Sequence, residues 1–317
     1  MIASINTDIR AARIDELLWS QGTWLVVDLG FAEKNATCGV AVHDDDAHTR
    51  TFADLRALAT DLARQSGPPL FLLLEAPLSV AFTPQGNPTG RTIERRNGRT
   101  RCWYAGLGAG VLTAATYLLR AVIDARPNRA VRLVEGFVSF KPGKVPSDHR
   151  ADAEALRGII RDPHTTGGII VPPEALSVRA DHTLHSAFRV AGFDTGVPPV
   201  VLAVHPDDII AYALRFNDCI TRHDLAGLTA LMTDDHTFID REGTVLRGRD
   251  TVLDAWHAFF AAHPGYRNTF THVDNRGDTV ILRGHATWTP GLPPDPALWH
   301  ATIRNGHISE WRILNPA

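Results

Sequence analysis

Two short apolar runs in the first quarter of the chain each end in an acid. Residues 23–30 read Thr-Trp-Leu-Val-Val-Asp-Leu-Gly, and residues 70–75 read Leu-Phe-Leu-Leu-Leu-Glu. Continuous apolar runs of this length are typical of strands that are buried on both faces of a sheet. The sequence therefore predicts two central strands with Asp28 and Glu75 at their ends. An acid there stays charged only beside a positive group such as a divalent cation; alternatively, Asp28 only ends a strand and begins a turn.

The rest of the first half alternates between helical and strand patterns. Apolar stripes at helical spacing predict helices, and short apolar runs predict strands. The expected helices cover residues 14–19, 53–65, 106–123, 148–160 and 181–192, the last of them ending at Gly192. The expected strands are residues 38–43 and a hairpin arm that ends near Phe52, both antiparallel to the first strand, and residues 130–140.

The pattern changes after the proline-containing link at residues 196–206. Helical stripes predict three helices, and short apolar runs predict one strand before the third helix and four after it. The helices cover residues 209–220, 225–231 and 252–260, the first strand covers residues 237–240, and the longest later strand runs from Thr279 to Thr289. Neither side of that longest strand is wholly polar. We therefore expect the outer face of this curved sheet to form a homodimer.

Length, charge and cysteine content narrow the class of protein. At 317 residues the chain is long enough for two domains. Its net charge of −3 gives no electrostatic basis for indiscriminate binding of nucleic acid, so any polyanion site has to be local. Three widely spaced cysteines argue against a disulfide framework. With no membrane-length apolar stretch and no signal-peptide core in residues 1–22, we expect a cytoplasmic protein without a membrane partner.

A cluster of arginines follows the second apolar strand. Five of them stand within eleven residues: Arg91, Arg95, Arg96, Arg99 and Arg101. Guanidinium groups present paired donors that suit phosphate oxygens, so these side chains are candidates for phosphate binding. The alternative is a charged loop that is simply exposed to water.

The order of elements in residues 22–204 resembles the ribonuclease H-like fold, and more narrowly the family of predicted ribonuclease H-like nucleases. The motifs are Val-Val-Asp28-Leu-Gly, Leu-Leu-Glu75-Ala-Pro-Leu, Glu135-Gly-Phe-Val-Ser-Phe and a segment that begins Asp181-His-Thr-Leu-His. The resemblance implies a mixed sheet flanked by helices and a set of carboxylates that holds Mg²⁺ or Mn²⁺. Where the final helix of such proteins carries an inward acid, this chain places His185 one turn after Asp181.

Hydrolysis of a phosphodiester fits the same residues. Two hard cations can activate a water and stabilise the leaving oxygen if several carboxylates converge on them. We take Asp28, Glu75 and Asp181 as metal ligands and, with Glu135, as catalytic residues. Asp152 is the alternative third ligand; Asp181 is preferred because its helix has an apolar side that should pack on the sheet.

Residues 206–317 resemble the nuclear transport factor 2-like cone, specifically its SnoaL-like polyketide cyclase branch. The resemblance is clearest in the segment from Asn217 to Asp240. Asp240 falls where the ketosteroid isomerases of this fold keep a proton-abstracting carboxylate, whereas Phe216 falls where they keep an oxyanion-binding tyrosine, which argues against isomerase chemistry of that kind. The expected pocket is lined by Phe216, Phe238, Asp240, Trp256, His272, His285 and Trp288.

The sequence thus predicts an α/β ribonuclease H-like domain at residues 1–204 and an α+β cone with a curved antiparallel sheet at residues 205–317. The leading hypothesis for function is a metal-dependent phosphodiesterase, acting on nucleic acid or a small phosphoester, fused to a cone that dimerises or binds a small apolar ligand. Two alternatives remain open: a SnoaL-like enzyme with a degenerate first domain, and a binding protein without catalytic activity in either half.

Overall fold

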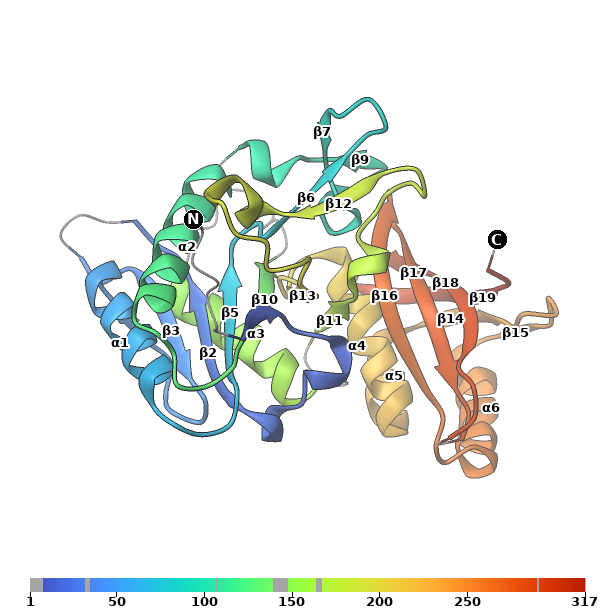
Figure 1. Cartoon of the computed structure of the whole chain (residues 1–317). Helices are drawn as coiled ribbons and strands as arrows, with labels where there is room; N and C mark the ends of the chain where they lie inside the picture. Colours follow the sequence, from blue (N-terminus) through green and yellow to red (C-terminus); the bar gives the residue numbers. More distant parts are fainter. Residues whose placement is uncertain are drawn as a thin grey trace.

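The computed structural model describes residues 8–31, 35–106, 108–138, 148–163, 167–289 and 291–316. Within these ranges the chain builds one large sheet from residues before 204 and a second from residues after 231, and the two lie side by side (Figure 1). No helix of the described part is both long and apolar enough to cross a lipid bilayer.

The first sheet has eight strands in the order β11-β13-β10-β5-β2-β3-β4, with β1 beside β10. The central strands β2, β5, β10 and β13 run parallel, while β3 and β11 are antiparallel to their neighbours. The strands are β1 Ile9–Ala11, β2 Thr23–Asp28, β3 Cys38–Val42, β4 His48–Arg50, β5 Leu70–Glu75, β10 Val131–Val138, β11 Gly168–Val171 and β13 Val200–Ala203.

Three helices cover the two faces of this sheet. Helices α1 (Phe52–Arg64) and α2 (Gly108–Asp124) pack on the face that carries Val27, Leu74 and Leu133. Helix α3 (His149–Arg161) packs on the opposite face, through Ala153, Leu156, Ile159 and Ile160. Both faces are therefore apolar, which is why the central strands read as continuous hydrophobic runs in the sequence.

Two helices expected from the sequence are wrong. Residues 14–19 form the 3₁₀ turns η1 (Ile14–Glu16) and η2 (Trp19–Gln21) rather than one helix. Residues 181–192 form strand β12 (Thr183–Ser186) and the 3₁₀ segment η6 (Ala187–Ala191), which ends at Gly192 in the left-handed conformation (φ 85°). Strand β12 forms because its backbone pairs with β6 (Ser79–Phe82), a distant segment that local spacing does not reveal.

The segment between β5 and α2 is not a plain loop. It contains short strands and 3₁₀ turns: β6, β7 Pro88–Thr89, η3 Thr92–Glu94, β8 Arg95–Arg96, β9 Arg99–Thr100 and η4 Trp103–Ala105; a further turn, η5 Pro173–Ala175, follows β11. Asn97 and Gly98 connect β8 to β9 with positive φ angles of 52° and 68°. Positive φ at both central residues is the signature of a tight type I′ hairpin.

The second sheet is a six-stranded curved sheet in the order β15-β14-β19-β18-β17-β16. Its strands are β14 Met232–Ile239, β15 Val245–Arg247, β16 Arg267–Arg276, β17 Thr279–Thr287, β18 Asp295–Arg304 and β19 His307–Leu314. Helices α4 (Ile209–Arg222), α5 (Leu225–Leu231) and α6 (Arg249–Ala262) accompany it. The sheet wraps around these helices, as the cone predicted from the sequence requires (Figure 1).

The two halves share a junction. One buried apolar cluster includes Val200 and Leu202 of the first sheet together with Leu214 of α4 and Phe270 of β16. The β8–β9 hairpin also reaches the second sheet: the Asn97 backbone N–H donates to Asn275 Oδ1 (3.2 Å), and Asn275 Nδ2 donates to Asn97 Oδ1 (3.0 Å). Arg95 of the same hairpin lies 3.0 Å from Asp274, whose side chain is on the outer face of the sheet, so the expected homodimer would have to use the remainder of that face.

Candidate active site in the cone

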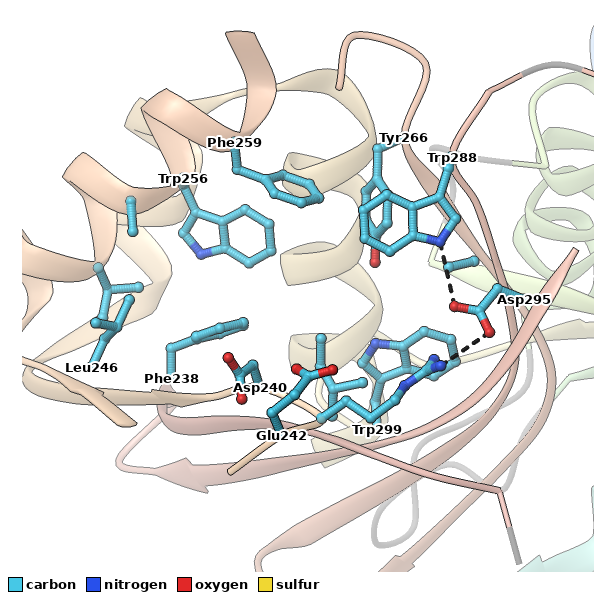
Figure 2. A pocket seen from close by; sticks show the side chains of 15 residues that line it. Phe238, Asp240, Glu242, Leu246, Trp256, Phe259, Tyr266, Trp288, Asp295 and Trp299 are labelled. Carbon is cyan, nitrogen blue, oxygen red and sulfur yellow. Dashed lines mark hydrogen bonds and ion pairs between the residues drawn. The ribbon is translucent and has the colours of Figure 1, made fainter. Parts of the chain in front are cut away.

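A cavity of about 420 Å³ opens between helix α6 and the inner face of the second sheet (Figure 2). This volume lies in the usual range for sites that bind small molecules. Its residues are mostly apolar or aromatic: Phe238, Asp240, Arg241, Glu242, Leu246, Val252, Ala255, Trp256, Phe259, Tyr266, Ala286, Trp288, Asp295, Trp299 and Ile313.

Aromatic rings in mutual contact form one wall of this cone cavity. Phe259 meets Trp256 edge-on at 5.5 Å between ring centroids, and it meets Tyr266 at 4.8 Å. Trp288 lies 5.0 Å from Tyr266 at a steep angle. Edge-to-face contacts of this kind fix the orientation of each ring, so the wall is preformed and presents flat apolar surfaces to a ligand.

One carboxylate is held at the cavity by the backbone. Asp240 follows the end of β14, and its Oδ1 accepts a hydrogen bond of 2.7 Å from the Thr244 N–H across a tight turn. The Asp240 side chain lies among the cavity residues next to Phe238 (Figure 2). This hydrogen bond from a backbone N–H fixes the position of the carboxylate at the cavity.

A second carboxylate takes part in a network. Asp295 Oδ1 accepts a hydrogen bond of 3.0 Å from Arg241, and its Oδ2 accepts one of 3.3 Å from the indole N–H of Trp288 (Figure 2). The hydrogen bond from Arg241 lowers the pKa of Asp295. Asp295 is thereby kept ionised, and both of its carboxylate oxygens already accept hydrogen bonds. We therefore assign it to orienting Arg241 and Trp288 rather than to serving as a base.

Hydrogen-bond donors without acceptors also line the cavity. The indole nitrogens of Trp256 and Trp299 are buried and have no hydrogen-bond partner within the described part of the chain. Burial raises the pKa of Tyr266, although the neighbouring Asn268 opposes this shift. The Tyr266 hydroxyl therefore stays protonated and can donate. A buried donor without an acceptor costs free energy, which a ligand oxygen would recover.

The structure brings together only some of the residues that the sequence assigned to the cone pocket. Phe238, Asp240, Trp256 and Trp288 line it. Phe216 is fully buried behind it, against Trp311. His272 and His285 lie on the other face of the sheet, because side chains alternate along a strand and the buried Val273 and Ala286 next to them take the inner positions. Those two assignments were wrong.

In the first half, Asp28 and Glu75 come together at the ends of adjacent strands. Asp28 pairs in register with Glu75 across β2 and β5, on the sheet face that α3 covers. His149 Nδ1 lies 2.9 Å from Asp28 Oδ2. Gly39 permits this approach, because a Cβ at that position would lie 1.7 Å from the His149 carbonyl oxygen. Burial and the Asp28 carboxylate raise the pKa of Glu75 well above its usual value, and Asp152 of α3 adds to the shift.

The preference for Asp181 over Asp152 was wrong. Asp181 lies in a turn before β12, half exposed, and pairs with Arg179 at 3.1 Å. Strand β12 and η6 belong to the side of the sheet that α2 covers, whereas Asp28 and Glu75 point to the α3 side. Asp152 is the acid that contributes to the electrostatic field at Glu75. The apolar stripe of α3 places it there, although the surrounding prolines and glycines suggested a surface insertion.

Glu135 and Arg91 do not belong to that carboxylate pair. Glu135 pairs in register with Leu74, so its side chain lies on the face opposite to Glu75. It is fully buried, receives hydrogen bonds from Arg91 and from the Leu78 N–H (both 2.9 Å), and Arg91 also binds Glu94 at 2.8 Å. Arg91, 1% exposed, is thus engaged by two carboxylates and cannot reach a phosphate.

The other four arginines are divided between two environments. Arg95 and Arg96 face the second sheet, with Arg95 3.0 Å from Asp274 and Arg96 3.8 Å from Asp208. Arg99 and Arg101 are exposed. The five guanidinium groups therefore do not form one phosphate site.

No group of three or more His, Cys, Asp or Glu side chains in the described ranges is placed to hold a metal ion. The Asp28–Glu75 pair offers two carboxylates, and the expected third ligand, Asp181, is elsewhere. Of the metal centre that the ribonuclease H-like resemblance implies, the Asp28–Glu75 pair is therefore the part that these ranges bring together.

Sequence reasoning missed several polar residues of the cone cavity. Arg241, Glu242 and Asp295 come from a turn and a strand start, where charged residues usually indicate exposure, and Tyr266 precedes β16. No local pattern marks Tyr266; the signal available in the sequence was the concentration of tryptophans around it, since four of the seven lie after residue 250.

Comparisons with known proteins concern the C-terminal part. No curated protein sequence matches the chain. Among solved structures, a proposed polyketide cyclase from Sinorhizobium meliloti is 22% identical over 32% of this chain and 92% of that one, with a TM-score of 0.30. A proposed SnoaL-like polyketide cyclase from Shewanella putrefaciens is 20% identical over 33% and 78% (TM-score 0.31). An NTF2-like protein of unknown function from Mesorhizobium loti is 24% identical over 36% and 98% (TM-score 0.31).

The match to a family model is confined to the same region and leaves the ribonuclease H-like prediction for residues 1–204 without support. Residues 213–311 match the model of the SnoaL-like domain family, so the C-terminal part of this chain is a SnoaL-like domain.

Proposed function

We propose that the SnoaL-like domain binds a small, largely apolar carbonyl compound and that Asp240 removes a proton from the carbon next to the carbonyl group. The observation that carries this proposal is the pairing, in one aromatic cavity, of a backbone-held carboxylate with buried indole N–H donors that lack an acceptor in the described part of the chain. Enolate chemistry needs both a base and donors for the developing oxyanion.

The proposed step moves one proton. The C–H bond next to the carbonyl breaks, its proton passes to the Asp240 carboxylate, and the electron pair moves onto the carbonyl oxygen. The Trp299 indole N–H and the Tyr266 hydroxyl are the donors assigned to that oxygen. Such donors stabilise charge most strongly where water is excluded, and the aromatic wall provides that exclusion. The resulting enolate can be reprotonated or can attack a second carbonyl of the same molecule, which closes a ring.

Binding can be tested without knowing the natural substrate. Trp256, Trp288 and Trp299 line the cone cavity, so a bicyclic aromatic ketone such as 1-tetralone should change the tryptophan fluorescence in a saturable way. Ala286 faces the cavity and is 2% exposed. Ala286→Leu fills part of the space and should weaken binding about tenfold or more, because overpacking a close-fitting site typically costs ~1–3 kcal/mol.

The matched control is Ala261→Leu, the same change at an exposed position of α6. It should leave the titration unchanged. Saturable binding that Ala286→Leu does not affect would place the ketone elsewhere and count against the proposal.

A second candidate function rests on a different observation. Asp28 and Glu75 are side by side in register, and one Asp28 carboxylate oxygen is buried without a hydrogen-bond partner in the described structure. Two adjacent buried carboxylates repel each other unless a proton or a cation lies between them. We therefore keep, as a proposal, that this pair binds Mg²⁺ or Mn²⁺ in a phosphodiesterase of the ribonuclease H-like type.

Calorimetry with Mn²⁺ tests this second candidate. Asp28→Asn removes one charge from the pair and should weaken Mn²⁺ binding at least tenfold, since the ion loses a charged ligand. Asp181→Asn removes the same charge at an exposed turn and should leave binding unchanged. Equal affinity of wild type and Asp28→Asn would refute the metal proposal.

A further inference from the structure

A second cavity, of about 410 Å³, lies between the two halves of the chain. Arg95, which opens the β8–β9 hairpin, and residues 175–178 form one side of it, and the outer face of β16 and β17 forms the other. It is separate from the cone cavity, which lies on the inner face of the same sheet. We refer to it as the junction cavity.

The junction cavity has an excess of positive charge. Arg95, Arg276 and Arg283 line it together with one carboxylate, Asp274. Asp274 is engaged by Arg95 Nε at 3.0 Å. Within the described part of the chain, Arg276 and Arg283 have no ion-pair partner, and both side chains are exposed. Three guanidinium groups against one carboxylate leave a local charge of about +2, in a chain whose overall charge is negative.

Arg96 adds a desolvated cation behind this surface. It is 3.8 Å from Asp208, and its Nε and one terminal nitrogen are buried without hydrogen-bond partners in the described structure. Burial lowers the pKa of Arg96. A guanidinium group with unpaired N–H donors favours the arrival of an anion nearby.

His272 is held neutral in this field. Burial, together with the charges of Arg283, Arg95 and Arg96, lowers the pKa of His272 to about 4, and Asp274 alone opposes this shift. The imidazole therefore reports the local charge: an anion in the junction cavity would offset the arginines and raise its pKa.

We propose that the junction cavity binds a small molecule that carries a phosphoryl group. Guanidinium groups pair with phosphate oxygens in a bidentate way, and Arg276 and Arg283 are available to do so. The volume lies in the range of sites for whole small molecules, so the ligand class is a small organic phosphate, for which free phosphate would be a weaker substitute.

The site depends on both halves of the chain. Arg95 comes from the first half, whereas Arg276 and Arg283 come from β16 and β17. The reciprocal amide contact of Asn97 with Asn275 fixes the hairpin at the cavity. A ligand there would bind only the assembled junction and so stabilise the full chain against unfolding.

Calorimetry with the full-length protein tests the proposal, with phenyl phosphate as the organic phosphate and inorganic phosphate as the second probe. Phenyl phosphate should bind at millimolar concentration or below and more tightly than inorganic phosphate; the reverse order would assign the site to free phosphate and overturn the assigned ligand class. Arg283→Ala should weaken binding about tenfold or more, because it removes a charge-assisted contact. The control Arg247→Ala removes the same charge from exposed β15 at the opposite edge of the sheet and should change nothing.

Proton NMR can measure the pKa of the His272 imidazole with and without ligand. Non-specific attraction of the ligand to charges elsewhere on the protein would leave this pKa unchanged. Saturation with phenyl phosphate should raise the pKa of His272 from about 4 by one unit or more. The proposal is overturned by the absence of binding at millimolar ligand, by equal losses in Arg283→Ala and Arg247→Ala, or by binding that leaves the pKa of His272 unchanged.

Discussion

Asp240→Asn is expected to abolish nearly all proton transfer by the SnoaL-like domain while leaving ligand binding almost intact. Asparagine keeps the shape of the side chain and can still accept the hydrogen bond from the Thr244 N–H, but it cannot act as a base at neutral pH. General-base catalysis typically contributes 10²–10⁴-fold. The rate at which the protein exchanges the α-hydrogens of 1-tetralone for deuterium, followed by NMR, should therefore fall at least about 100-fold.

Two further variants show whether Asp240 is the base. Asp254→Asn makes the same change on the exposed side of α6 and should keep the wild-type rate. Glu242 also lines the cone cavity but is exposed, so Glu242→Gln should cost much less than Asp240→Asn. A loss of exchange in Glu242→Gln with activity retained in Asp240→Asn would assign the base to Glu242 instead.

Arg91→Met is expected to destabilise the first half of the chain by about 3–5 kcal/mol, the usual cost of removing one partner from a buried ion pair. Arg91 is 1% exposed and lies between Glu94 and Glu135, which are 1% and 0% exposed. Burial raises the pKa of Glu135 to about 7 even though Arg91, the main opposing group, lowers it. Without Arg91, the carboxylates must become protonated or the segment must open. The midpoint of urea unfolding measures the loss.

The pH dependence and a rescue variant test this explanation. A raised pKa in the folded state means that stability falls as pH rises towards that pKa, so the defect of Arg91→Met should be larger at pH 8 than at pH 5. Adding Glu135→Gln to Arg91→Met should recover part of the stability. Arg99→Met, an exposed change in the same segment, should stay within about 0.5 kcal/mol of wild type. A defect in Arg91→Met that is independent of pH would contradict the ion-pair account.

The elements that the sequence predicted correctly are those with strong local periodicity. Helices α1, α2 and α3 and the three helices of the cone lie within a few residues of their expected ranges, as do strands β2, β5 and β10. In these segments an apolar stripe or run is enough to define the element, because burial against the sheet dominates the local preference. The SnoaL-like domain could be identified for the same reason.

The errors concern contacts between segments that are far apart in the sequence. Strand β12 exists through its pairing with β6, and Glu135 faces away from Glu75 because of the register between β10 and β5. Register is fixed by non-local packing, and a shift of one residue reverses the face on which every side chain lies. The placement of His272 on the outer face follows from an irregularity in the pairing of β16 between Phe270 and His272, which the alternation of residues alone did not reveal.

The position of a bound ketone tests the central proposal most directly. In a crystal of the full-length protein soaked with 1-tetralone, we expect the ligand in the cone cavity between Phe259 and Trp299. Its carbonyl oxygen should lie about 2.7–3.1 Å from Trp299 Nε1 or the Tyr266 hydroxyl, the distance at which oxyanion donors act, with its α-carbon facing Asp240. An empty cone cavity at full soaking concentration, or a ketone whose carbonyl points away from both donors, would contradict the proposed function.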